Sequence, residues 1–106
     1  MTDADKAFLV VAVALRDAHC MVSSEGGQTH VVLYEGIRAA PLLDWRGPRE
    51  HIVDGVLSSA HKWLQFYSVW SEKKKADAVR KVVTALLPYD GCRSPEELLL
   101  KAEVLA

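Results

Sequence analysis

Between residues 52 and 70 of this 106-residue chain, large apolar side chains recur every three or four positions. This spacing matches the turn of an α-helix and places the apolar side chains on one face. Pro48 suits the first turn of such a helix. We therefore expect a long amphipathic helix over about residues 49–71, with Glu50, Asp54 and His61 on its polar side.

The first segment of the chain also predicts a helix, from Thr2 to about Val22. Thr2 and Asp5 have the spacing of a capping box. Between Phe8 and Leu15 the segment is apolar on every side. A helix of this kind is usually covered on several sides, so we expect it at the centre of the fold.

Two more helices are indicated in the second half of the chain. Apolar residues repeat at helical spacing from Ala76 to Leu87, and Pro88 stops the pattern. Further on, Ser94 has the features of an N-cap, because proline follows it and Glu97 stands three positions later.

The stretch Thr29–Ala40 allows two interpretations. It favours a helix by a small margin, and Pro41–Pro48 then reads as a loop. The alternative pairs residues 20–24 with residues 30–34 across Gly26-Gly27 as a hairpin. The predicted fold is thus all-α, a compact single-domain bundle of four to five helices over residues 1–106, or α+β with a small hairpin near residues 20–34.

Composition excludes several classes of protein. The 13 basic and 14 acidic residues give a net charge of −1, so no strong field points to nucleic acid or an anionic membrane. The glycine spacing matches no nucleotide-binding loop, so we expect no cofactor. The apolar run Ala7–Leu15 is too short for a membrane span. The two cysteines indicate reduced thiols in a cytoplasmic protein.

A metal site is a weak alternative on the polar side of the long helix. Carboxylates and histidines at steps of three or four share a helix face and can bind one ion. A repeated Glu-x-x-His motif is absent, so a solvated polar face is preferred. The residues concerned are Glu50, His51, Asp54 and His61.

Cys92 stands near the start of the last predicted helix and next to Arg93. Both features favour the thiolate form of the side chain. No general base can be identified for it, so an incidental turn cysteine is the preferred interpretation. An enzyme is accordingly less expected than a binding protein.

Basic residues gather within residues 72–81, where five basic side chains stand against two acidic ones. Basic side chains next to aromatic ones can bind a nucleic-acid backbone and stack on its bases. A solvated helix face is the plainer explanation of so small a patch. The nucleic-acid alternative rests on Lys73, Lys74, Lys75, Arg80 and Lys81.

Four of the eight aromatic residues form a stripe on the long helix: Trp63, Phe66, Tyr67 and Trp70. A small bundle lacks the inner surface to bury both this stripe and the apolar first helix, so the surplus would meet another chain. The leading hypothesis is a small cytoplasmic interaction protein (an adaptor, inhibitor or accessory subunit) that forms a homodimer through these four residues. The hypothesis also allows a further protein partner, and it expects no contact with a membrane.

Overall fold

The computed structural model of the protein describes residues 1–34, 40–69 and 73–106. These residues form helices and an antiparallel sheet, so the all-α prediction is wrong and the fold is α+β. In chain order the elements are α1 (Asp3–Asp17), β1 (Met21–Glu25), β2 (Gln28–Tyr34), β3 (Pro41–Gly47), α2 (Ile52–Val69), α3 (Lys73–Leu86) and α4 (Pro95–Leu105), with short 3-10 turns at Arg49–His51 and Leu87–Tyr89.

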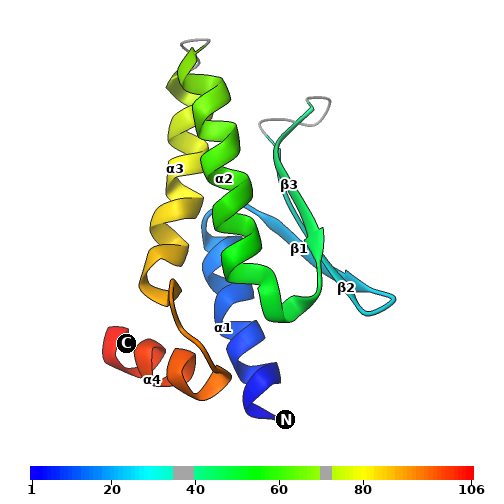
Figure 1. The fold of residues 1–106 in the computed structure, drawn as a ribbon, viewed down its shortest axis with the longest axis vertical. Helices are drawn as coiled ribbons and strands as arrows, with labels where there is room; N and C mark the ends of the chain where they lie inside the picture. The colour runs from blue at the N-terminus through cyan, green and yellow to red at the C-terminus, as the bar shows by residue number, and fades with distance from the viewer. Residues whose placement is uncertain (35–39, 70–72) are drawn as a thin grey trace.

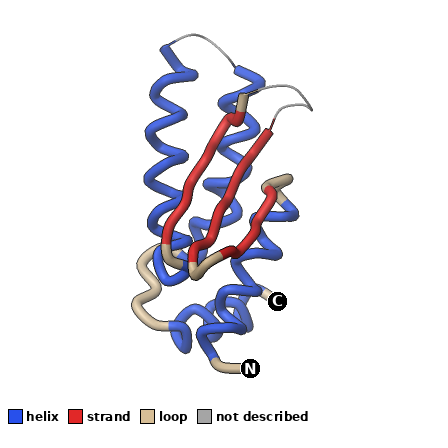
Figure 2. The backbone as a smooth tube through the Cα atoms, turned by 90° about the vertical axis from the view of Figure 1, so that its right-hand side faces the viewer, coloured by secondary structure: helices blue, strands red, loops and turns tan. Residues whose placement is uncertain are grey.

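The described elements pack in two layers (Figure 1). The sheet, in the order β1-β2-β3, covers one side of the helices, and its outer face is open (Figure 2). Val31 and Leu43 are fully buried on the inner face. They meet Val11, Leu15 and Val56 in one hydrophobic core.

The stretch predicted as a helix from residue 29 is strand β2, and the stretch predicted as a loop from residue 41 is strand β3. Gly26 and Gly27 both have positive φ, 59° and 79°, which a two-residue hairpin turn requires. The turn pairs Glu25 with Gln28 and sets the register of β1 against β2. The hairpin alternative located this pair of strands but missed β3. Residues 35–39 lie outside the described residues.

Helix α1 has the predicted capping box, since the Asp5 N–H donates to Thr2 Oγ1 and the Thr2 N–H donates to the Asp5 carboxylate. It ends at Asp17, short of the predicted end. His19 follows with a φ of 70°. Its N–H donates to the Arg16 carbonyl at 2.9 Å, and the Cys20 N–H donates to the Leu15 carbonyl at 2.9 Å. These bonds form a Schellman motif, which stops the helix and turns the chain into β1.

The other predicted helices are present with small shifts at their ends. The turn at Arg49–His51 leads into α2, and α3 begins at Lys73. Ser94 caps α4 as predicted, because its Oγ accepts the Glu97 N–H at 3.1 Å. In a capping box the Glu97 carboxylate would accept the Ser94 N–H. Here it accepts the Arg93 N–H instead, at 2.9 Å.

Candidate functional site

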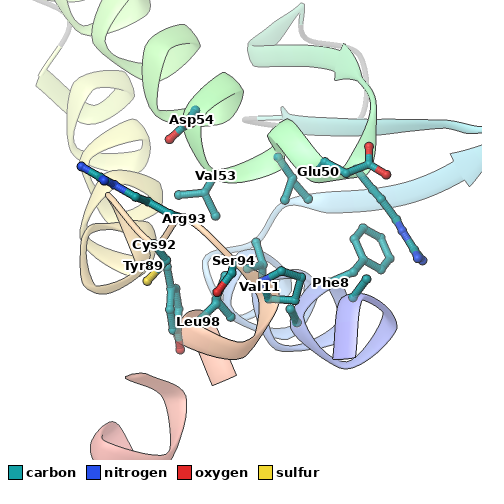
Figure 3. Close-up of a pocket in the computed structure, with 15 residues that line it drawn as sticks. Phe8, Val11, Glu50, Val53, Asp54, Tyr89, Cys92, Arg93, Ser94 and Leu98 are labelled. Atoms are coloured by element: carbon teal, nitrogen blue, oxygen red, sulfur yellow. The ribbon is translucent and has the colours of Figure 1, made fainter. Parts of the chain in front are cut away.

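A hollow of about 290 Å³ lies between α1, the start of α2 and the segment that joins α3 to α4 (Figure 3). Val11, Ile52 and Leu98 belong to its apolar wall, and charged side chains stand at its rim. One of these, Arg49, forms an ion pair of 2.8 Å with Asp5. The volume is at the lower limit for a ligand pocket, so the hollow accommodates at most a small apolar group.

Cys92 lines this hollow, and its thiol does not have the predicted thiolate character. Burial raises the pKa of Cys92, and the nearby carboxylates of Glu97 and Asp90 raise it further. The opposing influence of Lys101 is smaller than that of Glu97. The prediction considered only the helix N-terminus and a neighbouring arginine, whereas the folded chain adds desolvation and two negative charges.

The four residues of the metal alternative are all exposed. Glu50 and Asp54 stand at the rim of the hollow, whereas His51 and His61 do not line it. Among the residues that the structure describes, no group of three or more His, Cys, Asp or Glu side chains is placed to hold a metal ion. The metal alternative therefore receives no geometric support.

The basic residues of the nucleic-acid alternative all lie on α3. Lys73, Lys74 and Lys81 are exposed, and Lys75 is half-buried. The guanidinium of Arg80 forms an ion pair of 2.8 Å with Asp77 on the same helix. The arrangement is that of a water-facing helix side.

The predicted aromatic stripe is a cluster that belongs partly to the core. The Trp63 ring stacks on Tyr67 at a centroid distance of 5.8 Å and meets Phe66 edge-on at 5.9 Å. Tyr67 is only 4% exposed, so its ring is not available to a partner, whereas Phe66 is 49% exposed. Trp70 lies outside the described residues.

A His–Asp pair on the open face of the sheet escaped the sequence analysis. His30 Nε2 lies 2.7 Å from Asp44 Oδ1, and Ser23 stands opposite His30 in the register of β1 and β2. Within the described part of the chain, no side-chain hydrogen bond joins Ser23 to His30. The three residues therefore do not form the proton relay that activates a serine nucleophile.

The two edges of the sheet differ in how they are covered. Along β3, the Ser59 hydroxyl donates to the Asp44 carbonyl at 3.3 Å, and the Tyr67 hydroxyl donates to the Leu42 carbonyl at 2.9 Å. Both hydroxyls come from α2, which closes this edge. Along β1, the Arg16 guanidinium donates to the Val22 carbonyl at 3.2 Å, and the described residues offer the strand no other cover.

Apolar side chains are exposed on two further helices. On α1, Leu9 is 42% exposed and Val13 53%. On α4, Leu100 is 63% exposed and Val104 80%. Sequence reasoning treated α1 as the helix in need of cover, yet α4 is the more exposed of the two. The signal was visible in the run Leu98–Leu100, which places leucine on several sides of α4.

The described residues thus form an α+β fold with an open sheet edge at β1 and exposed apolar helix faces. Comparison with models of protein families, with curated proteins and with solved structures found no match to it. In the described parts of the chain, no helix has both the length and the apolar character needed to cross a membrane.

Proposed function

We propose that this protein is an interaction module (an adaptor, inhibitor or accessory subunit) that works as a homodimer joined through β1. The single observation that carries the proposal is the open edge of β1, beside an edge of the same sheet that α2 closes. Both cysteines are free, in agreement with the cytoplasmic location that we also propose.

An uncovered edge strand is a template for pairing with another chain, and monomeric proteins usually block it. The usual blocking devices are charged side chains (lysine above all), proline or a bulge in the edge strand. The sequence of β1, Met-Val-Ser-Ser-Glu, contains no lysine or proline and carries its one charge at its end, at Glu25; its pairing with β2 runs without a register shift. The strand is therefore suited to pair with a second copy of itself.

Val22 accepts its bond from Arg16 on the free side of β1, so Val22 and Ser24 direct their backbone groups away from β2. In an antiparallel pairing about a twofold axis at Ser23, Val22 of each copy faces Ser24 of the other. Residues opposed in this way exchange both backbone hydrogen bonds. The Val22 carbonyl has two lone pairs, so it can accept this bond beside the one from Arg16. The pairing joins the two sheets into one.

Apolar surface next to β1 adds to this contact. Leu9 and Val13 lie seven and three residues before Arg16, so they share the side of α1 from which Arg16 bonds to β1. Leu9 is 42% exposed and Val13 53%, so both can contribute apolar area to the contact.

Cysteine cross-linking tests the proposed register. In a Cys92→Ser background, Ser23→Cys places two thiols at the axis, where Cα atoms about 4.5 Å apart permit a disulfide. We expect covalent dimers on mild oxidation. The matched control is Glu25→Cys on the same strand, because the two copies of residue 25 would lie about 14 Å apart. Equal cross-linking of both variants would contradict the register.

Light scattering on a sizing column tests the dimer itself. The wild-type chain should elute at twice its mass of 11.7 kDa at high micromolar concentration. Ser24→Pro removes an N–H on the free side of β1 and leaves the ladder with β2 intact, so this variant should be a folded monomer. A monomeric wild-type protein would refute the proposed function.

A further inference from the structure

Helix α4 is held to the rest of the fold by only part of its surface. Leu98 is 8% exposed and joins the core, whereas Leu100 and Val104 on other sides are 63% and 80% exposed. A helix with large apolar side chains on several sides normally requires cover on more than one of them. The chain that the structure describes provides that cover on one side.

An open groove of about 660 Å³ lies between α4 and the N-terminal half of α1. It extends from Glu96 to Ala106, which is the full length of α4, or about 16 Å of helix. The floor is apolar and the rim is charged. The apolar lining residues are Val10, Leu99, Leu100, Ala102 and Ala106.

The rim of the groove is acidic. Asp3, Glu96 and Glu103 stand there against a single basic residue, Lys6. None of these three carboxylates forms an ion pair with another residue in the described ranges. A partner with basic side chains beside its apolar face would therefore meet complementary charge.

We propose that this groove binds an amphipathic helix of another protein, about three turns long, with an apolar stripe flanked by lysine or arginine. The length of the groove matches three turns, the apolar floor matches residues at helical spacing, and the rim matches the basic flanks. This inference goes beyond the proposed dimer. The dimer uses β1 together with Leu9 and Val13 of α1, whereas the groove lies between α4 and the side of α1 that carries Val10.

A second copy of the chain does not supply such a helix. The basic helix α3 has its apolar residues Val79, Val82 and Leu86 buried in its own core. The uncovered side of α4 carries Glu97 as well as Lys101, so it has no excess of positive charge. The occupant is therefore a different chain.

Two designed peptides of about 14 residues serve as probes, with leucines at helical spacing and either lysines or glutamates at the flanks. Fluorescence anisotropy should show binding of the Leu/Lys peptide and much weaker binding of the Leu/Glu peptide. Leu100→Ser and Glu103→Lys should each weaken the Leu/Lys peptide about tenfold. Asp17→Lys is the matched control, because it makes the same charge change at an exposed position at the far end of α1, outside both the groove and β1, and should leave the affinity unchanged.

Equal binding of the two peptides, or undiminished binding to both groove variants, overturns the proposal. Light scattering on the same variants separates this result from a failure of the dimer. Both groove variants should keep the mass of the wild-type protein. If Leu100→Ser changes that mass, the groove is a contact between copies, and the proposal of a different partner is wrong.

Discussion

The Tyr67 hydroxyl donates a hydrogen bond of 2.9 Å to the main-chain carbonyl of Leu42, and this bond is buried. It joins α2 to the edge strand β3 across 25 residues of sequence. Together with the bond from Ser59 to Asp44, it satisfies two outward carbonyls of β3 and covers this edge of the sheet. Tyr67, which the sequence analysis assigned to a partner interface, therefore covers an edge of the protein's own sheet.

Tyr67→Phe should lower the free energy of unfolding by about 1–3 kcal/mol, because the Leu42 carbonyl loses its donor while it stays buried. Urea denaturation followed by circular dichroism measures the change. Tyr34→Phe is the control, since Tyr34 is 47% exposed and should change stability little. Equal effects of the two substitutions would show that the buried bond has no special importance.

Gly55 lies inside α2, where alanine normally stabilises a helix by about 1 kcal/mol relative to glycine. Here the Trp45 indole occupies the space that a Cβ at residue 55 would need. The same ring lies 2.7 Å from the Cβ position of Gly47, so it has little room to move. Overpacking of this kind costs about 1–3 kcal/mol.

We therefore expect Gly55→Ala to destabilise the protein by about 1 kcal/mol, against the helix propensity. Thermal unfolding measures this effect, and tryptophan fluorescence reports the displacement of Trp45. Ser58→Ala, at an exposed position of the same helix, should be neutral or slightly stabilising. A stabilised Gly55→Ala variant would mean that the indole moves aside freely.

The helices could be predicted from the sequence because their signals are local. Apolar spacing and caps such as Thr2 and Ser94 act within a few residues, and both caps are present in the structure. The strands depend on distant partners. In β3 the bulge opposite Leu33 and Tyr34 turns both Leu42 and Leu43 inward, which removes the alternation typical of a strand.

The candidate surfaces were predictable only in part, for a related reason. The excess of apolar surface over core could be inferred from the sequence, but its location depends on which faces the fold covers. Tyr67 is covered by β3, which the sequence did not predict, and Leu100 is left open because α4 packs by one side. The open edge of β1 could not be inferred at all without the sheet.

His19 occupies the left-handed position that ends α1, with a φ of 70°. A non-glycine residue is strained there by about 1–2 kcal/mol, and glycine is not. Because glycine also adds entropy to the unfolded chain, His19→Gly should stabilise the protein by a net amount of about 0.5 kcal/mol. Chemical denaturation measures it, and His19→Ala, which keeps the Cβ and its strain, should give no gain.

Ionisation of the buried Cys20 thiol should make the protein less stable at alkaline pH. Burial raises the pKa of this thiol from 9.0 to about 11, so the folded state holds the proton more tightly than the unfolded state. The stability that the protonated Cys20 thiol contributes is fully present below pH 9 and is lost as the pH rises towards 11. At pH 10 the loss should be about 1.4 kcal/mol relative to pH 8.

Urea denaturation at pH 8 and pH 10 measures this loss, and Cys20→Ala isolates it from the titration of other groups. The difference in unfolding free energy between the wild-type protein and this variant should shrink between the two pH values. A pH-independent difference would show that Cys20 titrates alike in the folded and unfolded states.

The thiol of Cys92 should react slowly with iodoacetamide, which attacks only the thiolate. Because the pKa of Cys92 is also raised, we expect its modification to be slower than that of a free cysteine.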